Sequence, residues 1–116
     1  QLLSALENGF SQVEKGAGRF PQVAGMDVVY DPSAPAGSRV ASVTIGGQPL
    51  DPNKVYKVAT NDYMLGGGDG YTALGGGKVI VNAGNGNLMA NDVMTYIEKN
   101  GTVTTKLDGR IKKVGE

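Results

Sequence analysis

The chain has 116 residues, a length that fits one domain with a modest hydrophobic core. Its eleven basic and eleven acidic side chains cancel, so neither a nucleic acid nor an anionic membrane is an expected partner. The sequence contains no Cys and no His, which excludes thiol chemistry, imidazole catalysis and the usual nitrogen ligands of transition metals. We therefore expect residues 1–116 to form a single domain that has no catalytic residue and no metal site of its own.

The first half of the sequence predicts one helix and then strands. Over residues 2–15, apolar side chains recur at steps of three and four on one helical face, namely Leu2, Leu3, Leu6, Phe10 and Val13. Alternating patterns then predict strands at Val23–Tyr30 and Ser38–Ile45. The pair Gly46-Gly47 after the second of these predicts a hairpin turn, because adjacent glycines suit the backbone of a tight hairpin.

The second half predicts two more strands, a helix and a final strand. Val55–Thr60 is expected to be a strand buried on one face, and Lys78–Asn82 a short apolar strand. A helix is predicted over Asp92–Asn100, with Asn91 as its cap. Its inward-facing residues would be Val93, Met94 and Ile97. Gly109–Val114 would be the last strand.

The order of these elements indicates the fold class. No strand–helix–strand rhythm repeats along the chain, and nineteen glycines favour short strands and tight turns. We therefore predict an α+β fold with a mixed or antiparallel sheet and two main helices, at about residues 2–15 and 92–100. No apolar run reaches the ~18–20 residues that span a bilayer, so no membrane partner is expected.

The segment 61–71, with the sequence NDYMLGGGDGY, carries the chemistry of the chain. Glycines adopt positive φ without a steric clash, so the loop can curl back on itself. This would hold the Tyr63 ring and the Asp69 carboxylate, six residues apart, over one small concavity. A flat aromatic face suits a base, and a carboxylate suits ribose hydroxyls. We interpret Tyr63 and Asp69 as half of a nucleoside site, in which the backbone gains clearance from Gly66, Gly67 and Gly68.

The same loop has a second interpretation. Asp-Gly pairs commonly form simple turns in β-rich domains, so the chain could be a non-catalytic interaction module whose glycine loop is only a structural turn. The loop does not match either phosphate-binding glycine pattern in the required strand–helix context. Arg19, Arg39 and Arg110 are further candidates, for a contact with an anion. A lone arginine on the surface of a strand usually only faces solvent.

These motifs together resemble the C-terminal domain of the 5′-nucleotidase family of secreted metallophosphoesterases. The resemblance covers nearly the whole chain and rests on three segments: GRFPQVAGMDVVYD at 18–31, LDPNKVYKVATNDYMLGGGDGY at 50–71, and GRIKKV at 109–114. By the family pattern, the aromatic before the glycines stacks on the nucleobase and the aspartate accepts hydrogen bonds from the ribose. These roles fall on Tyr63 and Asp69. The family often has Phe at the position of Tyr63, which bears on substrate preference.

The resemblance also implies a larger protein. The parent would be a nucleotide-catabolising hydrolase of the periplasm, the extracellular space or the cell surface. Its N-terminal metallophosphatase domain, absent from this chain, would hold two divalent metal ions and would be the partner of the present domain. We expect the chain, which begins at Gln1, to be truncated on its N-terminal side and inactive alone. AMP, UDP-sugars and 2′,3′-cyclic nucleotides all remain candidate substrates.

Overall fold

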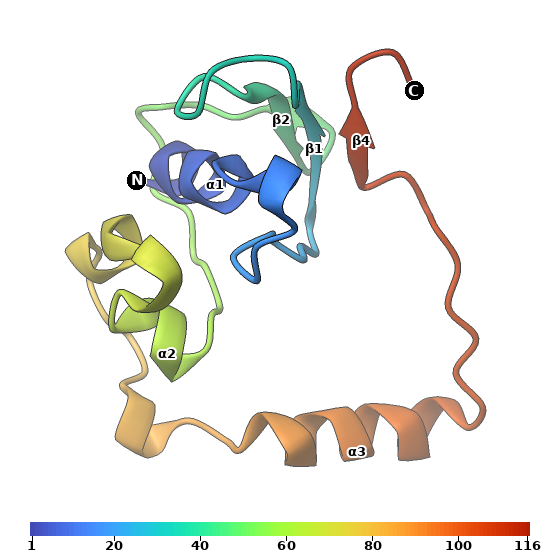
Figure 1. The fold of residues 1–116 in the computed structure, drawn as a ribbon. Helices are drawn as coiled ribbons and strands as arrows, with labels where there is room; N and C mark the ends of the chain where they lie inside the picture. Colours follow the sequence, from blue (N-terminus) through green and yellow to red (C-terminus); the bar gives the residue numbers. More distant parts are fainter.

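The computed structural model describes all of residues 1–116, and its four-stranded sheet joins three strands of the first half of the chain to one near the C-terminus (Figure 1). The strands are β1 (Met26–Tyr30), β2 (Val40–Ile45), β3 (Gln48–Pro49) and β4 (Ile111–Lys113), in the spatial order β3-β2-β1-β4. Strand β1 runs antiparallel to β2 and parallel to β4. The sheet is therefore mixed, and the predicted α+β class is confirmed.

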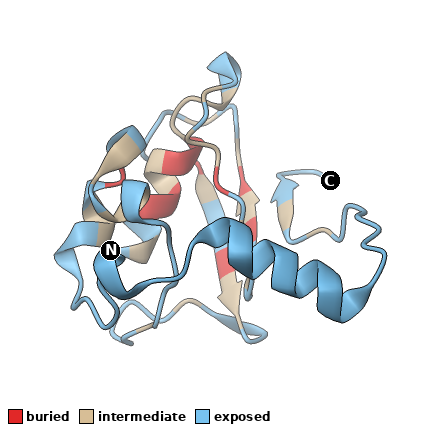
Figure 2. Ribbon diagram, turned by 90° about the horizontal axis from the view of Figure 1, so that it is seen from below, coloured by how far each residue is buried: buried red, intermediate tan, exposed pale blue.

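The helix α1 (Leu2–Phe10) packs on this sheet and forms the core with it (Figures 1 and 2). The buried cluster consists of Leu6, Phe10, Val28, Tyr30 and Val43. The rings of Phe10 and Tyr30 are stacked with their centroids 4.4 Å apart, and Phe20 meets Phe10 edge-on at 5.3 Å. Burying a side chain of this size stabilises the fold by about 1.5–3 kcal/mol, so these contacts fix α1 against β1 and β2.

The first helix is shorter than predicted. It ends at Phe10, and only a 3₁₀ turn at Val13–Lys15 continues it. The buried guanidinium of Arg39 gives the physical reason, because its Nη1 donates to the Phe10 carbonyl at 2.8 Å and to Glu14 Oε2 at 2.7 Å. The last carbonyl of the helix is thereby paired without a further helical turn. The same contact lowers the pKa of the Glu14 carboxyl below its ordinary value.

The alternating segments form strands, with narrower bounds than predicted. β1, β2 and β4 each lie inside the range that the sequence indicated. Gly46 and Gly47 have φ of 61° and 76°, which confirms the hairpin turn between β2 and β3. Gly25 and Arg39 lie just outside the first two strands, so the pattern located these elements and misplaced their ends by two or three residues.

Two predicted strands are absent. Val55–Thr60 and Lys78–Asn82 form no ladder, and no backbone–backbone hydrogen bond involves residues 55–60 or 78–81. A strand exists only where a second strand pairs with its N–H and C=O groups. The chain supplies no such partner at these segments, and the side chain of Val55 remains 93% exposed.

The helix α3 (Met89–Asn100) lies apart from the sheet (Figure 1). It begins three residues earlier than predicted, with Asn91 inside it, and ends at Asn100 as predicted, where Gly101 follows with φ of 69°. The prediction that its apolar residues face inward is wrong, because every residue from 75 to 108 is exposed (Figure 2). No helix in the chain combines the length and the apolar character needed to cross a lipid bilayer.

Candidate functional site

A short helix, α2 (Asp62–Leu65), carries the aromatic residue of the glycine loop. The side chain of Asn61 caps this helix and accepts the Met64 N–H at 2.8 Å. Gly67 follows with φ of 91°, a conformation that L-residues rarely adopt, and turns the chain into a 3₁₀ segment at Gly68–Gly70. The loop therefore folds back toward α2, as the sequence indicated.

The ring of Tyr63 lies against the backbone of Gly68. A β-carbon placed on Gly68 would come within 2.5 Å of two ring carbons, so only glycine permits this contact. The Tyr63 side chain is nevertheless 59% exposed. The ring thus has support from the loop on one side and open surface on the other, which is the geometry that a stacking platform requires.

The loop brings the two predicted site residues into direct contact. The Tyr63 hydroxyl donates to Asp69 Oδ1 at 3.0 Å. Asp69 has φ of 53° and is the one non-glycine residue of the chain with positive φ. Strain of this kind costs about 1–3 kcal/mol and persists only where neighbouring contacts hold it. The exposed carboxylate keeps Oδ2 free of hydrogen bonds within the chain.

Contacts with α1 hold the strained backbone in place. Asn8 Nδ2 donates to the carbonyl oxygen of Asp69 at 3.0 Å, and Arg19 Nη1 donates to Asn8 Oδ1 at 3.3 Å. A β-carbon on Gly70 would lie 2.7 Å from Asn8 Oδ1, so the two segments are in close contact. The position of Asp69 therefore depends on a residue 61 positions earlier in the sequence.

Tyr71 forms the second anchor of the loop. It is buried, and its hydroxyl donates to the carbonyl oxygen of Arg19. A β-carbon on Gly9 would lie 2.7 Å from that hydroxyl, so α1 presents a glycine where the loop packs on it. Burial raises the pKa of the Tyr71 phenol, and the Asp69 charge raises it further. No pattern in the sequence indicated a role for Asn8, Gly9 or Tyr71.

The three glycines that the sequence singled out serve different purposes. Gly67 supplies positive φ, and Gly68 leaves room for the Tyr63 ring. Gly66 has an ordinary φ of −77° and ends α2, and a β-carbon there would lie 3.4 Å from the Asp62 carbonyl oxygen. Of these three glycines, Gly67 and Gly68 are therefore the ones at which a side chain would alter the loop most.

Two of the arginines considered as anion contacts are occupied within the chain. Arg39 is buried and pairs with Glu14 and the end of α1. Arg110 pairs with Asp108 and also donates from Nη1 to the Val23 carbonyl oxygen at 3.0 Å. Both guanidinium groups are therefore already paired within the chain.

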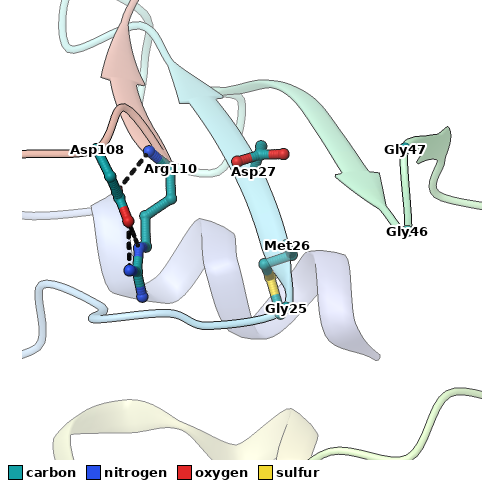
Figure 3. A pocket seen from close by; sticks show the side chains of 7 residues that line it. All are labelled: Gly25, Met26, Asp27, Gly46, Gly47, Asp108 and Arg110. Carbon is teal, nitrogen blue, oxygen red and sulfur yellow. Dashed lines mark hydrogen bonds and ion pairs between the residues drawn. The ribbon is translucent and has the colours of Figure 1, made fainter. Parts of the chain in front are cut away.

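A cavity of about 380 Å³ lies where β1 begins and β2 ends, beside the segment that leads into β4 (Figure 3). Its lining residues are Gly25, Met26, Asp27, Gly46, Gly47, Asp108 and Arg110. The hydrogen bonds from Arg110 lower the pKa of the Asp108 carboxyl to about 2, so these two groups neutralise each other. Neither Tyr63 nor Asp69 contributes to this cavity. No three side chains of the metal-ligating types are grouped anywhere in the chain.

Comparisons with known proteins show what the chain is similar to. Residues 1–76 match the family described as 5′-nucleotidase, C-terminal domain. The chain is 36% identical over 124 residues to the trifunctional nucleotide phosphoesterase protein YfkN of Bacillus subtilis (strain 168), covering 98% of this chain and 8% of that protein. It is also 36% identical over 118 residues to the snake venom 5′-nucleotidase of Gloydius brevicauda, covering 95% of this chain and 20% of that protein.

A solved structure shares the fold. The crystal structure of the 5′-nucleotidase precursor from Thermus thermophilus superposes with a TM-score of 0.87 and 38% sequence identity. The match covers 99% of this chain and 23% of that one. The chain thus spans less than a quarter of the length of each of these three relatives.

Proposed function

Because the chain belongs to the 5′-nucleotidase C-terminal domain family, as its motifs predicted, we propose that it is the nucleoside-recognition domain of a nucleotide phosphohydrolase. The relatives are named as nucleotidases and a nucleotide phosphoesterase, so the family is one of hydrolases. Residues 1–116 form one substrate-recognition unit in this proposal. The unit contributes no catalytic residue.

Tyr63 and Asp69 grip the nucleoside in this proposal. The base stacks on the open face of the Tyr63 ring, which is worth about 1–3 kcal/mol. The ribose hydroxyls donate to the Asp69 carboxylate, which adds about 1.5–3 kcal/mol because the acceptor is charged. The observation that carries the proposal is the hydrogen bond from Tyr63 to Asp69, since it holds ring and carboxylate side by side at an exposed surface.

Catalysis belongs to another part of the longer protein in this proposal. The chain has no His and no Cys and groups no three ligating side chains, so its residues do not fit a two-metal centre. We propose that an N-terminal metallophosphatase domain of the same polypeptide binds the two divalent ions that the family resemblance implies. That domain would be the partner of this one.

The proposed location is outside the cytoplasm: the periplasm, the extracellular space or the cell surface. The name of the snake venom relative supports a secreted parent, because venom proteins are secreted. The substrate class is a nucleotide, and AMP, UDP-sugars and 2′,3′-cyclic nucleotides are the candidates to compare. The hydroxyl group of Tyr63 is the feature of this chain that would influence which of these nucleotides is preferred.

Steady-state kinetics of the full-length enzyme test the proposal. Tyr63→Ala and Asp69→Ala should each lower kcat/KM for a 5′-nucleotide by roughly 10–100-fold. Hydrolysis of p-nitrophenyl phosphate, which has no nucleoside, should be unchanged. Tyr63→Phe keeps the ring and removes its hydrogen bond to Asp69, so its kcat/KM should lie between those of wild type and Tyr63→Ala. Asp27→Ala removes an exposed carboxylate outside the glycine loop and should stay close to wild type. Unchanged nucleotide kinetics in the two alanine variants would instead support the interpretation of the loop as a structural turn.

A further inference from the structure

Arg19 takes part in both contacts that anchor the glycine loop. Its backbone carbonyl oxygen accepts the Tyr71 hydroxyl, and its Nη1 donates to Asn8 Oδ1 at 3.3 Å. Asn8 in turn donates from Nδ2 to the carbonyl oxygen of Asp69 at 3.0 Å. Because Tyr71 follows Asp69 by two residues, Arg19 is connected to both ends of the segment that carries the carboxylate.

The side-chain amide of Asn8 holds Asp69 in only one of its two orientations. An amide has a donor end, Nδ2, and an acceptor end, Oδ1. A turn of 180° would set Oδ1 against the Asp69 carbonyl oxygen, and two acceptors do not pair. A guanidinium has donors and no acceptor, so Arg19 pairs with Oδ1 and not with Nδ2. The contact with Arg19 therefore selects the orientation that Asp69 needs.

No other side chain performs this selection. Asn8 Oδ1 accepts one hydrogen bond within the chain, the one from Arg19. Ser11 lies beside it, but its hydroxyl donates to the backbone carbonyl oxygen of Asn8 at 2.7 Å and accepts from Arg19 Nη1 at 3.4 Å. Without the Arg19 side chain, the orientation of the amide would depend on the Asp69 contact alone.

The guanidinium of Arg19 has no carboxylate partner. Arg39 pairs with Glu14 and Arg110 pairs with Asp108, whereas Arg19 forms no ion pair. The Arg19 side chain is partly buried, and its two hydrogen bonds within the chain both leave from Nη1. The side chain therefore donates only to the C-terminal end of α1, beside the glycine loop.

We propose that Arg19 is a positioning residue of the nucleoside site. Its guanidinium fixes the Asn8 amide with Nδ2 toward Asp69, and the amide then holds the strained backbone that orients the Asp69 carboxylate toward the ribose. Arg19 acts through Asn8 and contacts neither the nucleoside nor the phosphate. This inference rests on the proposed function, because it takes Asp69 as the residue that binds the ribose.

A double-mutant cycle in the full-length protein tests the proposal, with adenosine as the probe and calorimetry as the measurement. Arg19→Ala should weaken adenosine binding by roughly 3–10-fold, because the amide loses its fixed orientation. In an Asn8→Ala background the same substitution should change the affinity by less than about twofold, the usual error of such cycles. Equal losses in the two backgrounds would show that Arg19 acts independently of Asn8 and would overturn the proposal.

Substitutions of opposite hydrogen-bonding character give a second test. Arg19→Lys keeps a donor and should bind adenosine within about threefold of wild type. Arg19→Glu supplies an acceptor that pairs with Nδ2 and turns Oδ1 toward the Asp69 carbonyl oxygen, so binding should weaken by at least ~10-fold. Lys15→Glu makes the same change of charge at an exposed position and should leave binding unchanged. Equal affinities of Arg19→Glu and Arg19→Lys would overturn the proposal.

The phosphate group separates positioning from direct contact with the ligand. A positioning role predicts that Arg19→Ala weakens the binding of adenosine and of AMP by the same factor, since both present the same ribose to Asp69. A loss confined to AMP would make Arg19 a phosphate ligand and would overturn the proposal.

Asp69→Ala in the same assay separates this inference from the proposed function. Weaker adenosine binding in both Asp69→Ala and Arg19→Ala is the expected result. If Asp69→Ala weakens binding and the Arg19 variants do not, the positioning role alone is wrong. If Asp69→Ala binds adenosine like wild type, the nucleoside site itself is wrong, and the positioning role is wrong with it.

Discussion

Asn8 on α1 donates a hydrogen bond from Nδ2 to the carbonyl oxygen of Asp69 at 3.0 Å, across 61 positions of sequence. This contact holds the one non-glycine residue with positive φ in the chain. The carboxylate that we assign to ribose binding is thus positioned by the first helix as well as by its own glycine loop. The core contacts fix α1 on the sheet, and Asn8 on α1 then holds the backbone of Asp69. The loop is therefore held in place by the sheet through α1.

The first prediction concerns this contact. Asn8→Ala removes the donor and leaves the Asp69 carbonyl without its partner, a change worth about 1 kcal/mol. We expect KM for a 5′-nucleotide to rise by roughly 3–10-fold in the full-length enzyme, while p-nitrophenyl phosphate hydrolysis is unchanged. Gln12→Ala, just beyond the end of α1, is the matched control. A KM equal to that of wild type would show that Asn8 does not position Asp69.

The second prediction concerns the glycine beneath the aromatic ring. In Gly68→Ala the new β-carbon would meet Tyr63 ring carbons at 2.5 Å, so the ring must move and its hydrogen bond to Asp69 is lost. Affinity for a nucleoside should fall by about tenfold, which corresponds to ~1.4 kcal/mol. Gly77→Ala is the control, because a β-carbon there meets its nearest neighbour at an ordinary 3.7 Å. Equal affinities of the two variants would contradict the assigned contact.

The third prediction is a titration. Burial raises the pKa of the Tyr71 phenol above its ordinary value of 10.0. Tyrosinate absorbance of the folded protein should therefore contain a component that appears above pH 10, and Tyr71→Phe should remove it. The contribution of this group to stability is fully present below pH 10 and is lost as the pH rises through the higher pKa of the folded state. A titration unchanged by Tyr71→Phe would disprove the burial of this hydroxyl.

The fourth prediction concerns acid stability. Hydrogen bonds from Arg110 lower the pKa of Asp108 to about 2 from its ordinary value of 3.8. Because the pKa of Asp108 is lower in the folded state than in the unfolded state, its contribution to the free energy of unfolding is present above about pH 4. That contribution is lost as the pH falls toward 2. Urea unfolding at about pH 7 and about pH 2 should show a smaller pH dependence for Asp108→Asn than for wild type. Identical pH dependence would mean that the pair contributes nothing to stability.

The sequence predicted the elements whose partners are close along the chain. The apolar stripe of α1, the alternation of β1 and β2 and the Gly46-Gly47 turn are local patterns, and the structure forms all of them. The end of α1 depends instead on Arg39, which directly precedes β2 and donates a hydrogen bond to the carbonyl oxygen of Phe10. No periodicity in the helix itself could indicate that residue.

The wrong predictions share one physical cause. Val55–Thr60 has the composition of a strand and α3 has an amphipathic stripe, but neither meets a partner within these 116 residues. The composition of a segment indicates whether it needs a packing or hydrogen-bonding partner. It does not indicate which part of the polypeptide supplies that partner. The close contact of Tyr63 with Asp69 was accessible from the glycines between them, whereas the roles of Asn8 and Gly9 required the fold.

The most direct test of the central claim is a crystal structure of the full-length enzyme with a bound nucleoside monophosphate. We predict that the base stacks on the Tyr63 ring and that a ribose hydroxyl lies within about 2.5–3.0 Å of an Asp69 carboxylate oxygen. A nucleoside bound away from the glycine loop, or a Tyr63 ring turned into the protein interior, would contradict the account.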